Sequence, residues 1–238
     1  IGDGDTGWGN AINIKRTVKG YSAAGFACIM LEDQLAPKRC GHTQGKQVVS
    51  RAEANARFRA AVDARDEVRA AGGDILIMAR TDANASNGLE DAIERCREFR
   101  GIGVDITFLE APKTVDEMKR YCDEVEGPKM ANMLEGGKTP ILPNKELEDL
   151  GFALAVRPIT LLSAAIKAMQ DVLVLLKNEE DTVPKLLPSF AELKTVVRFD
   201  QYFEEDAKYT KKYGNKCILL WQCGSFFEVY SLKKNGKF

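Results

Sequence analysis

The sequence lacks the features of several protein classes. No apolar run approaches the ~20 residues that a membrane-spanning helix needs, and no Gly-x-x-x-x-Gly-Lys-Ser/Thr phosphate-binding motif occurs. Neither sign of charge is in excess, because 34 Lys and Arg stand against 35 Asp and Glu and leave a net charge of −1. We therefore expect no membrane partner and no attraction of the whole chain to nucleic acid, so local charges must hold any acidic ligand.

Histidine and paired cysteines are also scarce. His42 is the only histidine, and the six cysteines include no Cys-x-x-Cys pair. Their scatter is unlike the regular framework of a short secreted disulfide protein, which favours reduced thiols in the cytoplasm or another reducing compartment. The chain opens with Ile1 rather than Met, inside a motif. We expect the true N-terminus, with any organelle-targeting segment, to lie upstream.

Short apolar runs alternate with helical patterns along most of the chain. Strands are expected over residues 1–5, 27–31, 75–79, 104–109, 129–133 and 152–156, and helices over 10–24, 51–71, 89–99, 115–125, 145–150 and 160–176. Continuous apolar runs are typical of parallel strands that are buried on both faces. The alternation predicts an α/β fold, a (β/α)₈ TIM-type barrel that lacks its first two strands.

The pattern changes after the last expected barrel helix. We divide the chain into a partial catalytic barrel over residues 1–177, a C-terminal helical extension over 178–212 and a short β-hairpin tail over 213–238. Within the extension a helix is expected over 190–212. The tail contains two aromatic and aliphatic runs separated by Gly224, which predicts a hairpin.

Residues able to perform chemistry recur where the expected strands end. They are Asp3, Asp5, Glu32, Arg80, Glu110 and Asn132. Active sites of (β/α)₈ barrels are built at the carboxyl ends of successive strands, whereas an open doubly wound sheet concentrates its site at one switch point. The distribution therefore favours the barrel and predicts one site at its mouth.

Asp3 and Asp5 are separated by a single glycine, so both carboxylates can approach one point. Glu32 offers another carboxylate at the end of the next strand. Mg²⁺ prefers such oxygen ligands, and Mn²⁺ is a possible substitute. The alternative is a pair of solvated loop carboxylates.

The segment Lys38-Arg-Cys40-Gly-His42 is the sharpest local signal. A thiol between two cations favours the thiolate form, which acts as a base or nucleophile, and Gly41 leaves room for a ligand. A structural cysteine beside solvated basic residues is the alternative. Arg80 is suited to hold a carboxylate in two hydrogen bonds, or else it pairs with Asp82 or Glu110.

Several motifs together resemble the isocitrate lyase/phosphoenolpyruvate mutase superfamily. They are Asp3-Gly-Asp-Thr-Gly-Trp-Gly-Asn10, Glu32-Asp-Gln34, Pro37-Lys-Arg-Cys-Gly-His42, Ala79-Arg-Thr-Asp82, Leu109-Glu-Ala-Pro112 and Leu161-Leu-Ser-Ala-Ala-Ile-Lys-Ala-Met169. The likeness extends to about Tyr209. The Lys-Arg-Cys-Gly-His form resembles the lyases, including 2-methylisocitrate lyase and enzymes that cleave oxaloacetate or 2,3-dimethylmalate.

This resemblance implies a role for each strand-end residue. Asp3, Asp5 and Glu32 would bind Mg²⁺. Cys40 would be the acid/base, tuned by Lys38 and His42, while Gly41, Arg80, Glu110 and Asn132 would bind a small dicarboxylic or tricarboxylic acid. The family also implies a homotetramer in which a C-terminal helix, over 160–176 or after Pro188, is exchanged between subunits.

The tail has a resemblance of its own. The stretch from Tyr209 to Tyr230 is similar to the opening of a MutS-type mismatch-recognition domain, in which a Phe-x-Glu element wedges an aromatic ring beside a mispaired base. Phe226 and Glu228 would be those residues. A lone two-stranded hairpin is marginally stable, so we do not expect nucleic acid to be a partner.

These observations predict a Mg²⁺-dependent carbon–carbon lyase or hydrolase that acts on a small 2-hydroxy or 2-oxo acid. One alternative is a phosphonate-side mutase or hydrolase of the same superfamily, resembling carboxyvinyl-carboxyphosphonate phosphorylmutase. The other is a non-catalytic fragment fused to a DNA mismatch-repair protein.

Overall fold

The structure, a computed structural model, describes residues 1–39, 45–179, 186–214, 221–223 and 226–228. It forms two compact units, Ile1–Ile166 and Lys167–Phe238. The three-part division expected from the sequence stays a prediction. No helix of the described residues is long and apolar enough to cross a membrane.

The N-terminal unit contains the six parallel strands that the sequence predicts. They are β1 (Gly2–Asp3), β2 (Cys28–Glu32), β3 (Leu76–Thr81), β4 (Ile106–Leu109), β5 (Met130–Asn132) and β6 (Leu154–Val156). Strands β1 to β4 form one sheet in chain order, β5 pairs with β6, and a parallel bridge between Thr107 and Lys129 connects the two groups. The α/β class is confirmed. Among the described residues neither β1 nor β6 has a second neighbouring strand, so the strands do not close a barrel.

Helices follow the strands as expected. They are α1 (Ala11–Ala23), α2 (Arg51–Ala70), α3 (Ala83–Ser86), α4 (Leu89–Ile102), α5 (Val115–Glu124), α6 (Asn144–Leu150) and α7 (Thr160–Lys177), of which only the one-turn α3 was not predicted. Polar caps begin several of them: the side chains of Ser50 and Thr114 accept the backbone N–H of Glu53 and Glu117. These bonds satisfy donors that a helix start leaves without partners.

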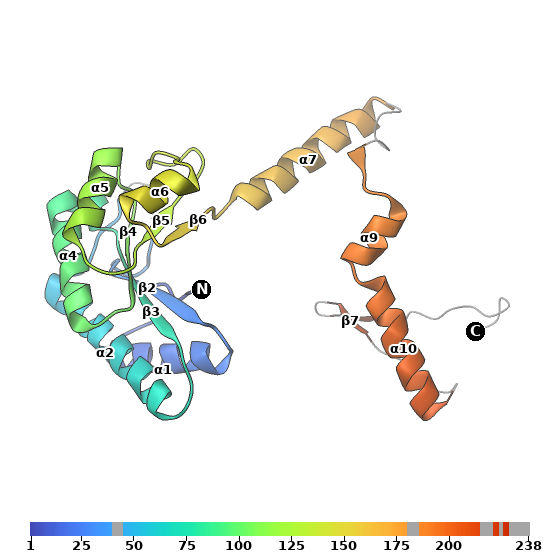
Figure 1. Ribbon diagram of the computed structural model, residues 1–238, viewed down its shortest axis with the longest axis horizontal. Coiled ribbons are helices and arrows are strands. Elements are labelled where there is room, and N and C mark those ends of the chain that lie inside the picture. The colour runs from blue at the N-terminus through green and yellow to red at the C-terminus, as the bar shows by residue number, and fades with distance from the viewer. Residues whose placement is uncertain (40–44, 180–185, 215–220, 224–225, 229–238) are drawn as a thin grey trace. The chain divides into compact units, whose positions relative to one another are not determined.

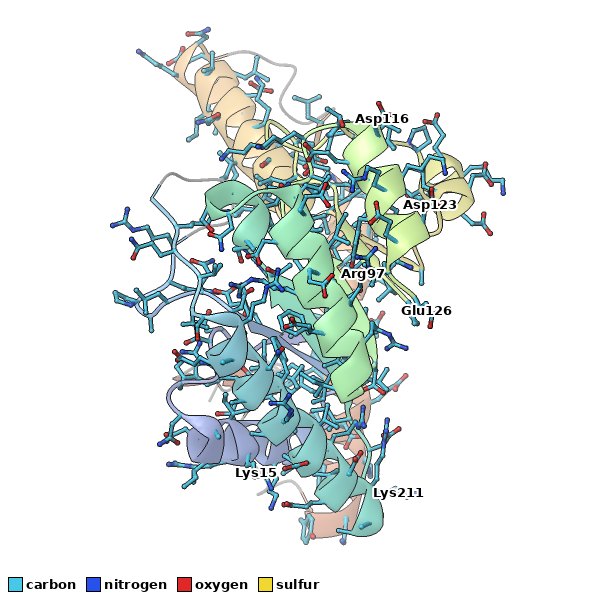
Figure 2. All side chains as sticks on the ribbon, turned by 90° about the vertical axis from the view of Figure 1, so that its left-hand side faces the viewer. Lys15, Arg97, Asp116, Asp123, Glu126 and Lys211 are labelled. Carbon is cyan, nitrogen blue, oxygen red and sulfur yellow. The ribbon has the colours of Figure 1, made fainter. Side chains whose placement is uncertain are left out.

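Residue alternation along the strands separates two faces of the sheet. Ile29, Leu31, Ile77 and Ala79 pack against α1, α2 and α4, where the rings of Phe58 and Phe99 lie 4.3 Å apart. Figure 1 shows these helices along one side of β2 and β3. Their outer surfaces are charged, as Lys15 on α1 and Arg97 on α4 show in Figure 2. The other face is lined by Cys28, Met78, Ile106, Phe108 and Met130.

One group of ion pairs lies at the amino ends of the strands. Asp105, just before β4, accepts hydrogen bonds from Arg65 and from the backbone N–H of Ile77, both at 2.8 Å. Arg65 also donates to the Gly103 carbonyl at 2.7 Å, and Arg69 donates to Asp74 at 2.9 Å. These contacts tie α2 to the loops that enter β3 and β4.

The C-terminal unit contains α9 (Phe190–Val196), α10 (Phe199–Tyr213) and an antiparallel hairpin of β7 (Trp221–Cys223) and β8 (Phe226–Glu228). The hairpin is confirmed. The single helix expected over 190–212 is wrong, because Arg198 adopts a left-handed conformation (φ 61°) between α9 and α10. A left-handed residue interrupts the run of helical dihedral angles.

Candidate active site

Strand alternation brings four of the expected site residues to one face. Glu32 continues the series of Cys28 and Met30 on β2, and Arg80 that of Met78 on β3. Glu110 and Asn132 stand in the same relation to Phe108 and Met130. Glu32 and Arg80 are register partners, and the backbone N–H of Glu110 bonds the Thr81 carbonyl at 3.0 Å. The strand ends thus bring these side chains together on the face that α1, α2 and α4 do not cover.

Asp3 and Asp5 reach the same region from β1. The Asp5 backbone N–H donates to Asp3 Oδ1 at 2.9 Å, and the Asp5 carbonyl accepts the N–H of Glu32 at 2.9 Å. Asp5 has a positive φ of 49°. The intervening Gly4 allows close packing, because a Cβ there would lie 2.8 Å from the side-chain ends of Ile29 and Leu31 and would force them to shift.

Lys38 extends into this carboxylate group. Its ammonium lies 3.3 Å from Asp3 and 3.7 Å from Glu32 and forms an ion pair with Asp5. Although burial lowers it, the bond to Asp5 and the charges of Glu32 and Asp3 leave the pKa of Lys38 above its ordinary value. Lys38 therefore contacts all three of the expected metal ligands.

Glu32 is the least satisfied polar group of the site. Its side chain is 1% exposed, and neither carboxylate oxygen has a hydrogen-bond partner among the residues that the structure describes. Burial raises the pKa of this carboxyl to about 7, against the opposing charge of Arg80. Buried polar atoms without partners are uncommon in folded proteins, and they gather where a ligand supplies the missing partner.

Arg80 is held on three sides. Asp82 accepts from its Nε at 2.8 Å and from Nη2 at 3.1 Å, and the guanidinium lies over the Phe108 ring at 5.3 Å. Glu32 and Glu110 lie 3.4 and 3.8 Å away. Burial opposes the charged form, but these carboxylates outweigh it and raise the pKa of Arg80. Of the two expected alternatives, the structure shows the pairing of Arg80 with Asp82 and Glu110, and the binding of a substrate carboxylate stays a prediction.

Asn132 is oriented by Glu110. Its Nδ2 donates to Glu110 Oε1 at 3.5 Å, while its buried Oδ1 has no hydrogen-bond partner among the described residues. Because a carboxylate only accepts, the amide nitrogen must face Glu110, and Oδ1 is left available to a donor. A ligand hydroxyl fits this position.

Residues 34–47, which contain Cys40 and are here called the Cys40 loop, are held through their described ends. Gln34, which is 1% exposed, donates to the Arg39 carbonyl at 2.9 Å and accepts the Arg39 N–H at 3.0 Å. On the returning side, Lys46 forms a fully buried ion pair with Asp82 at 3.0 Å. Cys40, Gly41 and His42 lie outside the described residues.

The negative charges of Asp3, Asp5 and Glu32 would attract a cation, but the described residues do not form a metal-binding geometry. Within the described ranges, no group of three or more His, Cys, Asp or Glu side chains is arranged to hold a metal ion. The three expected ligands surround the Lys38 ammonium instead. Carboxylate oxygens are nevertheless the ligands that a hard divalent cation prefers, and both Glu32 oxygens lack hydrogen bonds.

Comparison with known proteins identifies the family of this chain. The phosphoenolpyruvate phosphomutase family model matches residues 1–177. The chain belongs to this family. It is 42% identical over 211 residues to 2,3-dimethylmalate lyase of Eubacterium barkeri, covering 88% of this chain and 71% of the relative. It is 43% identical over 215 residues to the chloroplastic carboxyvinyl-carboxyphosphonate phosphorylmutase of Arabidopsis thaliana, covering 88% and 62%.

Solved structures share the fold of this chain. Oxaloacetate acetylhydrolase bound to 3,3-difluorooxalacetate has a TM-score of 0.79 at 34% identity, covering 87% of this chain and 69% of that one. Phosphonopyruvate hydrolase in complex with oxalate and Mg²⁺ has a TM-score of 0.72 at 25% identity, covering 87% and 71%. The expected superfamily is confirmed, and this chain spans between 62% and 71% of the lengths of these relatives.

Three residues near the site were missed in the sequence: Gln34, Lys46 and Asp82. Asp82 was considered only as a partner for Arg80, although its position two residues after Arg80 in Ala79-Arg-Thr-Asp82 was a usable signal. In the tail, Phe226 and Glu228 are the first and last residues of β8, but their side chains are not described by the structure. Their role at DNA stays a prediction.

Proposed function

We propose that this chain is a Mg²⁺-dependent carbon–carbon lyase or hydrolase that acts on a small 2-hydroxy or 2-oxo dicarboxylic or tricarboxylic acid. The observation that supports this most is the buried Glu32, whose oxygens lack hydrogen bonds beside Arg80, Asp3 and Asp5. A folded protein has no structural need for such a carboxylate. A site for a cation and an anionic substrate explains it.

Asp3, Asp5 and Glu32 would hold the cation, with Mn²⁺ as a possible substitute for Mg²⁺. When bound, the metal supplies a positive charge that stabilises negative charge on substrate oxygen. In the arrangement described here, the Lys38 ammonium partly neutralises the same carboxylates. With a divalent cation held by these carboxylates, Lys38 would no longer be needed to neutralise them and could tune Cys40, two residues further on.

Arg80, Glu110, Asn132 and Gly41 would bind the substrate. Cleavage moves the electron pair of the carbon–carbon bond into the carboxylate-bearing fragment, which becomes an enediolate, and the guanidinium of Arg80 stabilises the charge where it develops. In a 2-hydroxy acid, the 2-hydroxyl becomes a carbonyl and gives its proton to a strand-end carboxylate. In a 2-oxo acid, water first adds to the carbonyl, and one of the two resulting hydroxyls loses its proton in the same way as the product carboxylic acid forms. Cys40, tuned by Lys38 and His42, returns a proton to the enediolate carbon.

The test is product release from 2-methylisocitrate, isocitrate, oxaloacetate and 2,3-dimethylmalate with Mg²⁺, Mn²⁺ or EDTA. We expect turnover of one acid, its loss in EDTA and its loss in Cys40→Ser. Cys122→Ser is the matched control, because Cys122 lies on α5 away from the strand ends. No turnover of any acid by the folded chain in the presence of metal would reject the proposal.

A phosphonate-side activity is the second candidate, favoured by the 43% identity to carboxyvinyl-carboxyphosphonate phosphorylmutase. A mutase does not need the cysteine as an acid/base. Turnover of a phosphonate or its phosphoenol isomer that survives Cys40→Ser would therefore favour this candidate over the lyase.

We also propose that the enzyme is a homotetramer formed by exchange of a C-terminal helix. Helix α7 has no buried residue, and Leu161 and Leu173 are 85% and 64% exposed. Light scattering should give four times the chain mass of 26.3 kDa. The double substitution Leu161→Glu and Leu173→Glu should lower that mass. Val115→Glu, at an exposed apolar position on α5, should not.

A further inference from the structure

One buried carboxylate connects two parts of the candidate site. Asp82 follows β3 and is fully buried. Its Oδ1 accepts from Lys46 at 3.0 Å and from Arg80 Nη2 at 3.1 Å, while Oδ2 accepts from Arg80 Nε at 2.8 Å. Asp82 therefore orients the guanidinium and holds the base of the Cys40 loop at the same time.

The surrounding residues leave Asp82 little freedom. Its backbone N–H donates to Asp33 Oδ1 at 3.0 Å, and Asp33 is itself held by Thr81 at 2.7 Å and Arg95 at 3.2 Å. Two parallel hydrogen bonds to a guanidinium fix its plane as well as its distance. A shift of this carboxylate would move both Arg80 and Lys46.

We propose that Asp82 is a positioning residue that sets Arg80 and the Lys46 end of the Cys40 loop in one arrangement. This proposal rests on the proposed function for the roles of Arg80 and Cys40. It goes further by making the Arg80 guanidinium and Lys46, which follows Cys40 by six positions, depend on the same carboxylate. Asp82 itself does not touch the substrate.

Two readouts separate the two connections. Oxalate, the dianion bound by phosphonopyruvate hydrolase, reports on Arg80 when its affinity is measured by calorimetry with Mg²⁺. The rate at which iodoacetamide alkylates Cys40, followed by mass spectrometry of its peptide, reports on the loop. Both are measured on the full chain, per folded molecule.

We expect Asp82→Asn to change both readouts, because an amide can accept only through its one oxygen. Oxalate affinity should fall at least about 10-fold, and kcat/KM about 100-fold, the scale of a misplaced catalytic group. Lys46→Gln should change the alkylation rate and lower kcat while oxalate affinity stays unchanged. The double variant should be no worse in alkylation than Asp82→Asn, since both changes break one connection.

Asp105→Asn is the matched control, because Asp105 also holds an arginine and a backbone N–H but at the opposite strand ends. It should lower the melting temperature without changing either readout. Asp82→Asn that lowers the melting temperature alone, with wild-type oxalate affinity and alkylation, would overturn the proposal.

The proposal can fail separately from the proposed function. If the wild-type chain binds no oxalate, the proposed function is rejected. The NMR resonance of the Arg80 Nε–H proton then replaces oxalate as the readout. Slow exchange of that proton in the wild type and its loss in Asp82→Asn support the positioning role. Equal exchange in both proteins contradicts it.

Discussion

Two carboxylates at opposite ends of the parallel strands differ in their hydrogen bonding. At the amino ends Asp105, 20% exposed, accepts hydrogen bonds from Arg65 and Ile77. At the carboxyl ends Glu32, 1% exposed, accepts none from the described residues. The more deeply buried carboxylate is the less satisfied one, so burial alone does not explain the difference. The fold supplies hydrogen-bond donors to Asp105 but none to Glu32, and this difference is what the ligand site that we propose would explain.

The substitution Glu32→Gln tests this difference with the largest expected effect. Removing the charge should lower kcat/KM on the order of 100- to 1000-fold, as loss of a group that stabilises developing charge does. The same change should leave the protein folded, because the carboxylate forms no hydrogen bond that the fold requires. Initial rates and thermal melts of the same samples check both halves. A variant that unfolds would place Glu32 with the structural charges.

Stability should also depend on pH through Glu32. Its pKa rises from 4.5 in the unfolded chain to about 7 in the fold, so between these values the folded state holds a proton that the unfolded state has lost. Unfolding free energy therefore decreases as pH rises from 4.5 to 7, by about 3 kcal/mol from this group. Denaturant titrations in EDTA should show this decrease in the wild type relative to Glu32→Gln. Parallel pH profiles of the two proteins would contradict it.

Asp105→Asn should lower stability and leave activity unchanged, the reverse of what we expect for Glu32→Gln. Loss of the charge weakens the bond from Arg65, a side chain that is 9% exposed, and should lower the unfolding free energy by about 1–3 kcal/mol. Activity per folded molecule should stay at the wild-type level, because Asp105 lies at the amino end of β4. Denaturant midpoints and kcat/KM measure the two effects. A large loss of kcat/KM would show that the amino ends also shape the site.

The sequence predicted the strands of this fold better than the contacts of its site. Strands such as β2 and β3 are continuous apolar runs, and that signal is local. The positions of Glu32, Arg80 and Glu110 followed from the rule that barrel sites lie at strand ends. The interruption between α9 and α10 had no such signal, because Arg198 is an ordinary residue in a left-handed conformation.

Pairings between distant residues were the other limit. The contact of Lys46 with Asp82 spans 36 positions, and that of Lys38 with Asp3 spans 35. Nothing in the spacing of these residues specifies such a pair, since it depends on how distant parts of the chain fold together. The sequence therefore predicted which residues come to the strand ends, whereas the structure showed which of the described ones contact one another.

The smallest expected effect is that of Ser50→Ala, which tests a structural residue near the carboxyl ends of the strands. Ser50 begins α2 directly after the Cys40 loop, and its hydroxyl accepts the Glu53 N–H at 3.2 Å. Ser50→Ala should lower the unfolding free energy by about 1 kcal/mol, the usual value of a helix cap. It should leave kcat/KM unchanged, as should Thr114→Ala at the start of α5. A loss of kcat/KM in Ser50→Ala but not in Thr114→Ala would mean that the start of α2 helps to hold the loop, so the functional region would extend from the strand ends into the helix that follows them.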